Sequence, residues 1–209
     1  RTYTASRIKI AAVGPFGLER IESMTEGFFG HWTPKYSNWT ANEKVRNKGQ
    51  RIISSESQFQ DHFMTGWRIP GIHSVDRRAL LLLNNVLGGP AMNSRLGLNI
   101  REKHGIAYNI ESYMNLYSDT GLLGIYLGCD PNQTKRAEQL VHKEVEKFQH
   151  RSLGVLQLSK AKNQFIGQMA LAEDNGLNSA IGAARALMHF GTVNTFEFVA
   201  EQITKLTNE

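Results

Sequence analysis

The chain has 209 residues, of which 41% are hydrophobic and 21% are charged, a composition typical of a globular protein with a sizeable buried core. Its net charge of +5 includes no run of five or more like charges, which favours a solvated basic surface over a nucleic-acid-binding face. The single cysteine, Cys129, excludes an internal disulfide, and the sequence has no apolar run long enough to span a membrane.

The first fifty residues predict a strand, a helix and a linker. Residues 7–13 are largely apolar and end at a Gly-Pro pair, which favours a short strand. Apolar residues at helical spacing predict a helix over residues 17–29, and Gly30 is a suitable stop. Residues 31–50 are polar and lack a period, which is typical of a linker or a long surface crossing.

The next segment predicts a strand followed by a buried helix. Residues 51–67 carry isoleucines and aromatic residues among polar ones, a strand-like pattern. Ser74 can cap a helix over residues 78–87, whose four consecutive leucines predict burial on more than one side. Gly88-Gly89-Pro90 ends that helix.

The second half of the chain predicts a hairpin and then only helices. Residues 106–115 and 121–129 alternate apolar and polar side chains around a polar turn, which predicts a β-hairpin. Asp130-Pro131 is typical of a helix start, and Asn194 with Glu197 resembles a capping box for the last helix. The expected helices cover residues 130–150, 155–173, 176–190 and 195–207. Early strands and late helices together predict an α+β fold, an antiparallel or mixed β-sheet covered on one side by several α-helices.

An arginine and a tyrosine lie seven residues apart in the stretch between the buried helix and the hairpin. Arg101 is near the end of a short predicted helix, Gly105 turns the chain, and Tyr108 follows on a strand. Two directional donors held on the two arms of one turn can bind a peptide carbonyl. The residues alone also permit a structural interpretation, with an arginine favoured by the helix dipole and a half-buried strand tyrosine.

The sequence contains no compact metal-binding motif. Its seven histidines form no H-x-x-E-H or H-E-x-x-H arrangement, which would bring two imidazoles and a carboxylate to one helical face. His142, Glu146 and His150 are four residues apart on one predicted helix, but three ligands spread over two turns converge poorly. We therefore expect no metal site and no bound cofactor in this chain.

Three stretches, taken in order, carry motifs of a known family. Together they resemble the C-terminal, non-zinc half of the pitrilysin/insulinase family of zinc metallopeptidases, in its bacterial, processing-peptidase-like branch. The likeness covers most of the chain. The stretches are Tyr3-Thr4-Ala5-Ser6-Arg7 with the apolar run to Gly14, residues 76–89 with Ser94-Arg95-Leu96, and Ile100-Arg101-Glu102-Lys103-His104-Gly105-Ile106-Ala107-Tyr108.

The resemblance implies a role for the arginine and the tyrosine. In that family, an Arg and a Tyr seven residues apart reach over a zinc site carried by a separate, similar half, where they bind the substrate backbone and stabilise the tetrahedral intermediate. The matching positions are Arg101 and Tyr108, which are therefore the expected site residues. The zinc, bound through H-x-x-E-H, would activate a water molecule.

The missing zinc motif limits what this chain is expected to do. Because the sequence has no H-x-x-E-H, the resemblance implies a domain that is inactive alone and whose zinc belongs to a missing N-terminal half or a partner subunit. The first residue is Arg1 rather than methionine, which favours a truncated polypeptide. The expected partners are a peptide substrate and the H-x-x-E-H half, in a homo- or heterodimer, with no nucleic acid and no membrane. The expected location is the bacterial cytoplasm.

The resemblance also predicts a domain division. Residues 1–33 would be the closing strand and helix of a preceding homologous domain, residues 34–50 the linker, and residues 51–209 the C-terminal peptidase-like domain, which lacks its last strand. We hypothesise that the strand at residues 7–13 fills the vacant sheet edge, within the chain or by exchange between two copies.

A second interpretation is a catalytically inactive scaffold of the same family, like the non-catalytic core subunits of respiratory complexes. Such a chain would keep the fold as an interaction surface and bind no substrate. The presence of both Arg101 and Tyr108 argues against this interpretation.

Overall fold

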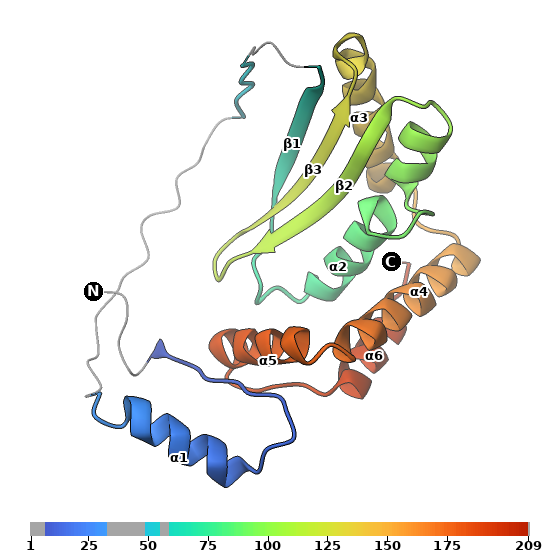
Figure 1. Ribbon diagram of the computed structural model, residues 1–209. Helices are drawn as coiled ribbons and strands as arrows, with labels where there is room; N and C mark the ends of the chain where they lie inside the picture. Colours follow the sequence, from blue (N-terminus) through green and yellow to red (C-terminus); the bar gives the residue numbers. More distant parts are fainter. Residues whose placement is uncertain (1–6, 33–48, 55–58, 209) are drawn as a thin grey trace. The chain divides into compact units, whose positions relative to one another are not determined.

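The computed structural model describes residues 7–32, 49–54 and 59–208. Contacts divide the chain into two units, one formed by residues 1–56 with 172–193 and the other by residues 57–171 with 194–209. The second, larger unit contains the sheet (Figure 1). Arg101 and Tyr108 belong to this unit.

The larger unit is built on a three-stranded antiparallel sheet with the strand order β1-β3-β2. The strands are β1 (Asp61–Ile69), β2 (Ala107–Leu116) and β3 (Gly121–Cys129). The predicted hairpin is confirmed as β2 and β3, whose turn is closed by a 2.8 Å hydrogen bond from the Tyr117 N–H to the Thr120 carbonyl. Along β1, half-buried and exposed side chains alternate, as expected for a sheet with one covered face.

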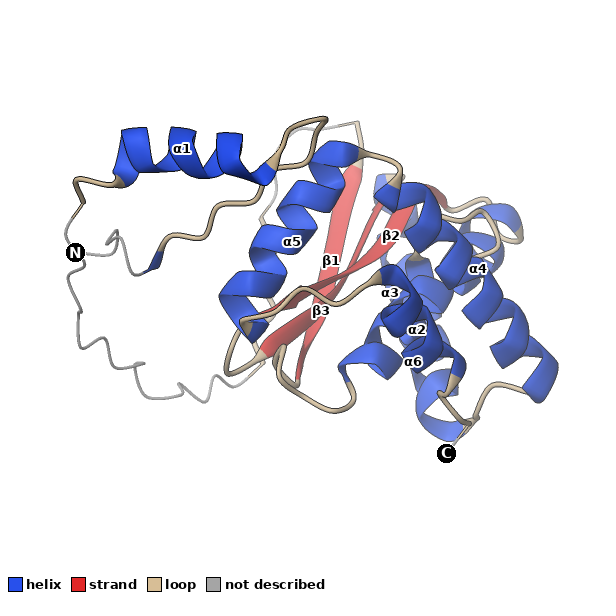
Figure 2. Ribbon diagram, turned by 90° about the horizontal axis from the view of Figure 1, so that it is seen from below, coloured by secondary structure: helices blue, strands red, loops and turns tan. Residues whose placement is uncertain are grey.

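Helices of the larger unit cover one face of this sheet. Figure 2 shows α2 and α3 on the same side of the strands. Their inward side chains join the strands in one core, in which Leu87 of α2, Ile125 and Leu127 of β3, and Val141 of α3 are at most 1% exposed. The helical elements are α2 (Arg77–Gly88), the π-helix η2 (Gly97–Glu102), the 3-10 turn η3 (Pro131–Gln133), α3 (Thr134–His150), α4 (Val155–Glu173) and α6 (Phe196–Thr204). The α+β class predicted from the sequence is confirmed.

The described part of the smaller unit contains two helices, α1 (Leu18–Phe29) and α5 (Gly176–Phe190). Helix α1 has the predicted extent, with Gly30 at its C-cap. Helix α5 begins where the Asn175 side chain accepts hydrogen bonds from the two N–H groups of Leu177 and Asn178. It ends at Gly191, whose positive φ of 72° favours glycine.

The strand predicted over residues 7–13 is wrong. These residues form no strand, and the sheet of the described residues consists of β1, β3 and β2. A strand needs a paired neighbour, and an apolar run without one has no ladder to join. The same reasoning applies to residues 51–54, because β1 begins only at Asp61 and Ile52 is 84% exposed.

Two predicted helix starts are shifted. Asp130 makes no side-chain cap bond, and Pro131 opens a 3-10 turn instead, so α3 begins at Thr134. The last helix is capped by Thr195, whose hydroxyl accepts from the Phe198 N–H, rather than by Asn194. The predicted linker lies mostly outside the described residues, and the predicted domain division remains a prediction.

Candidate functional site

Arg101 is positioned by an unusual helix and a defined helix stop. It is the fifth residue of the π-helix η2, in which the Lys103 N–H bonds to the Leu98 carbonyl. After η2, Gly105 adopts a φ of 61°. The N–H groups of Gly105 and Ile106 bond to the carbonyls of Arg101 and Ile100, respectively, in a Schellman-type stop. The predicted glycine turn is therefore confirmed, and it leads directly into β2.

Tyr108 lies at an irregularity in β2. Ala107 is opposite Cys129 and Asn109 is opposite Gly128, so the register shifts across Tyr108. A bulge of this kind inserts one residue and changes the direction of a side chain. Tyr108 and Asn109 are consecutively exposed, and Tyr108 is 65% exposed. In a regular strand, one of these two neighbouring side chains would point to the covered face of the sheet. At the bulge both are exposed, and the phenol of Tyr108 therefore reaches solvent.

The Tyr108 hydroxyl donates a 2.8 Å hydrogen bond to Oδ1 of Asp130, the residue that follows β3. This hydrogen bond, together with the negative charge of Asp130, raises the pKa of Tyr108 above its ordinary value. The phenol consequently remains protonated, and able to donate, throughout the neutral range.

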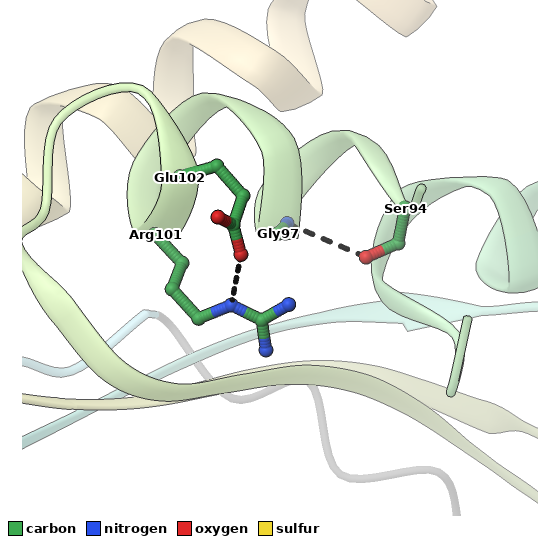
Figure 3. Close-up of polar contacts among 4 residues, drawn as sticks. All are labelled: Ser94, Gly97, Arg101 and Glu102. Carbon is green, nitrogen blue, oxygen red and sulfur yellow. Dashed lines mark hydrogen bonds and ion pairs between the residues drawn. The ribbon is translucent and has the colours of Figure 1, made fainter. Parts of the chain in front are cut away.

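Arg101 donates from Nε to Oε1 of the neighbouring Glu102 over 2.9 Å (Figure 3). The two side chains are 34% and 53% exposed, so this ion pair contributes little to stability. Only Nε takes part in it. Among the described residues, the two terminal nitrogens of the guanidinium have no hydrogen-bonded acceptor, which leaves the fork available to a ligand.

Arg101 also borders a cavity of about 350 Å³. The cavity lies between β2, the end of α2, the loop that follows α2, and Phe165 of α4. Its lining residues are Leu81, Asn84, Asn85, Gly88, Gly89, Pro90, Ala91, Met92, Ser94, Arg101, Asn109, Ile110, Glu111, Ser112 and Phe165. Tyr108 is outside this set. The structure thus holds Arg101 and Tyr108 on the two arms of one turn, each hydrogen-bonded to its own carboxylate.

The sequence reasoning missed three residues of this site. Asp130 was interpreted as a helix cap, whereas its carboxylate accepts from Tyr108. Asn84 and Asn85 line the cavity from α2, and the Oδ1 atom of each is buried without a hydrogen-bond partner among the described residues. Two adjacent asparagines at the end of a leucine-rich helix were the available signal, because buried amides normally have partners.

Replacing Asp130 with asparagine should lower the pKa of Tyr108 toward the ordinary value of about 10, because the hydrogen bond to the Asp130 carboxylate and the negative charge of that carboxylate raise it. A raised folded-state pKa contributes stability that is present below the unfolded pKa and is lost as pH rises through the folded pKa. Ionisation of Tyr108 above pH ~10 should therefore cost the Asp130→Asn variant less folding stability than it costs the wild type.

The measurement is a phenolate absorbance titration, with Tyr108→Phe identifying the Tyr108 signal. Asp119→Asn, which alters an exposed carboxylate in the β2–β3 turn, is the control and should leave the titration of Tyr108 unchanged. An identical Tyr108 titration in wild type and Asp130→Asn would show that Asp130 does not set this pKa.

The described residues offer no metal site. They contain no group of three or more His, Cys, Asp or Glu side chains placed to hold an ion. A zinc ion therefore has no fitting set of ligands in this part of the chain. In the same described part, no helix combines the length and the apolar content that crossing a bilayer requires.

The family of this chain follows from its similarity to known proteins. A family model described as "Peptidase M16 inactive domain" matches residues 1–165. The chain belongs to this family, as the motif resemblance predicted.

The relatives of this chain include bacterial proteins named as zinc proteases. An uncharacterised zinc protease of Mycobacterium tuberculosis is 25% identical over 213 residues, which cover 100% of this chain and 48% of that protein. The uncharacterised zinc protease YmxG of Bacillus subtilis is 30% identical over 172 residues, covering 81% of this chain and 41% of that protein. The chain thus spans about half the length of the curated relatives it matches.

Solved structures share the fold at lower sequence identity. A peptidase M16 inactive domain from Pseudomonas fluorescens superposes with a TM-score of 0.63 at 20% identity, covering 71% of this chain and 35% of that one. A protease from Helicobacter pylori gives a TM-score of 0.79 at 16% identity, covering 94% of this chain and 48% of that one.

A further relative by sequence, subunit 1 of the mitochondrial cytochrome b-c1 complex of Caenorhabditis elegans, is 23% identical over 220 residues, covering 98% of this chain and 45% of that protein.

Proposed function

We propose that this chain is the substrate-binding, non-metal half of a zinc metalloendopeptidase that cleaves peptides or unfolded segments. The zinc would be held by an H-x-x-E-H half, on another domain or on a partner subunit in a homo- or heterodimer. Membership of the inactive-domain family supports the proposal, as do relatives that are named zinc proteases and are about twice as long.

The observation that carries this proposal is the pair of donors presented by one turn. Arg101 has two terminal nitrogens without an acceptor among the described residues, and the bulge at Tyr108 exposes a phenol that is protonated at neutral pH. Both groups can donate to the carbonyl oxygen of a bound peptide. As that oxygen acquires negative charge in the transition state, the two hydrogen bonds strengthen, which is how such donors accelerate acyl transfer.

In this proposal the Tyr108 hydroxyl has two alternative hydrogen-bond acceptors, Asp130 and the substrate. Without substrate, the phenol donates to Asp130. A phenol has a single hydrogen to donate, so it must leave Asp130 in order to reach a substrate oxygen. Asp130 would therefore hold the side chain in place until a peptide binds.

Replacing Tyr108 with phenylalanine should lower kcat/KM for peptide cleavage by about tenfold to a hundredfold, because one donor to the oxyanion is lost. The enzyme is the natural full-length protein, or the natural complex, that contains the zinc-binding half. Tyr117→Phe, which changes an exposed tyrosine at the end of the hairpin, is the matched control. Full activity in Tyr108→Phe, with unchanged zinc content, would remove the proposed role of the phenol.

A scaffold function is the second candidate, and it is favoured by the 23% identity to a subunit of the cytochrome b-c1 complex. In that case, the chain would assemble with other subunits and neither Arg101 nor Tyr108 would contact a substrate. The two candidates predict different results for substitutions at Arg101 and Tyr108. If the chain is only a scaffold, these substitutions leave any peptide cleavage by the assembly unchanged, whereas they lower it if the chain binds substrate.

The proposal includes a cytoplasmic location in a bacterium, and the bacterial source of the named zinc protease relatives supports the second part of this statement. One structural neighbour, PqqL of Escherichia coli, is described as a periplasmic protease. Cell fractionation of the natural host distinguishes the two compartments.

A further inference from the structure

We infer that the cavity beside Arg101 is a subsite for the main chain of a bound peptide, in which an extended segment lies along the outer edge of β2. This inference rests on the proposed function and adds to it a place for the part of the substrate that is not being cleaved. Its evidence is the position of the cavity, the free strand edge and the chemistry of the lining.

The cavity lies beside the edge of β2 rather than above one face. Four consecutive β2 residues line it, from Asn109 to Ser112. Ile110 and Ser112 belong to the buried face of the strand, whereas Asn109 and Glu111 are exposed. Successive strand residues point to opposite faces, so only a space next to the edge can contact all four.

The backbone along that edge is available for pairing. Among the described residues, β2 pairs with β3 on one side and with no strand on the other. Alternate residues of an edge strand direct their N–H and C=O groups outward. The end of α2 closes the edge at one point, because a Cβ at Gly88 would lie 2.6 Å from the Ser112 nitrogen. The open part of the edge therefore runs from Asn109 to Glu111.

The lining complements neutral amide groups better than ions. It contains one cation, Arg101, and one anion, Glu111, so these formal charges balance. Asn84 and Asn85 each have a buried Oδ1 with no partner in the described part of the chain, and the Asn85 Nδ2 donates to Oε1 of Gln168. A ligand that both donates and accepts satisfies such a lining, whereas a bare anion or cation meets a repelling group.

An extended peptide has the required pattern of groups. It presents alternating N–H and C=O groups to a strand edge, and strand addition is a recurrent mode of peptide recognition. The cavity volume of about 350 Å³ falls in the range of ligand pockets. Arg101 lies at the boundary of this cavity, so a segment seated on β2 continues directly toward the donors of the proposed site.

The test is an N-methyl scan of a peptide substrate or competitive peptide inhibitor, using the natural protein or complex that contains the zinc-binding half. N-methylation removes one N–H at a time. We expect N-methylation at every second residue of the bound segment to raise the inhibition constant about tenfold, because each of these residues loses one hydrogen bond to the strand edge. N-methylation of the residues in between should change the inhibition constant little. A uniform or absent effect would overturn the strand-edge subsite.

A variant of the chain provides the second arm of the test. Asn84→Ala removes an amide whose Oδ1 has no partner among the residues that the structure describes, so the thermal midpoint should stay constant or rise. The inhibition constant of the unmethylated peptide should rise several-fold. Asn115→Ala, on the exposed part of β2 and outside the cavity, is the matched control and should change neither quantity. Equal peptide affinity in both variants would contradict the inference.

These outcomes separate the subsite from the proposed function. If Tyr108→Phe lowers kcat/KM but the scan shows no alternation, the donors act on substrate and the strand-edge subsite is wrong. If no peptide binds the complete protein, both are wrong. If the chain dimerises and Asn84→Ala abolishes the dimer, the edge of β2 instead binds a second copy of the chain, and the peptide subsite is wrong.

Discussion

Replacing Arg101 with alanine should lower kcat/KM for peptide cleavage by the complete enzyme by about a hundredfold to a thousandfold, the effect of removing one preorganised oxyanion donor. Two terminal nitrogens of Arg101 have no acceptor among the described residues, and the residue borders the cavity beside β2. The loss should fall mainly on kcat, because the oxygen that these nitrogens bind carries its charge only in the transition state.

Stability should change little in this variant. The only ion pair of Arg101 among the described residues is the exposed one with Glu102, and such pairs contribute at most about 1 kcal/mol. Arg101→Lys keeps the charge but loses the forked geometry, so it should recover only part of the activity. Lys103→Ala, which removes an exposed cation two residues away, is the control for charge. An Arg101→Ala enzyme with full activity would show that the guanidinium does not contact the reacting group.

Replacing Ile125 with alanine should destabilise the larger unit by about 3 to 5 kcal/mol. Ile125 is in the central strand β3, is 0% exposed, and belongs to the core that joins the sheet to α2 and α3. Removing its side chain leaves a cavity that strands paired on both sides cannot collapse to fill. The measurement is urea unfolding of the natural protein, followed through the transition that contains the sheet.

Leu122→Ala is the matched control for this prediction. Leu122 is in the same strand but is 37% exposed, so the same truncation removes less buried surface and should cost clearly less free energy. Equal losses in the two variants would contradict the assignment of the covered face of the sheet.

Local sequence signals predicted the turn that carries the site. Gly105 was recognisable as a turn residue, and the structure shows why it is needed, because its φ of 61° favours glycine. The hairpin was predicted by alternation, and its register follows from a short turn. These features depend on neighbouring residues, so a single sequence contains the information for them.

Features that depend on distant partners were not predicted. The bulge at Tyr108 exists only relative to β3, and Asp130 reaches Tyr108 across 22 positions of sequence. The apolar residues 7–13 suggested a strand, but no described strand pairs with them. The cavity beside β2 requires α2, α4 and the sheet together, and no pattern within one element reveals it.

The motif resemblance supplied what local physics left open. An arginine near a helix end and a tyrosine on a strand are common structural residues, and only their place in a linked set of motifs suggested a functional pair. The family match over residues 1–165 confirms the family. The roles of Arg101 and Tyr108 remain proposals that activity measurements must test.

A double-variant cycle on Arg101 and Tyr108, with kcat/KM for peptide cleavage as the readout, tests the proposed pair most directly. Wild type, Arg101→Ala, Tyr108→Phe and the double variant are compared in the complete enzyme at equal zinc content. If both side chains donate to one developing oxyanion, each single variant loses activity and the double variant loses less than the product of the two losses. Unchanged kcat/KM in all three variants would contradict the proposal and favour the scaffold.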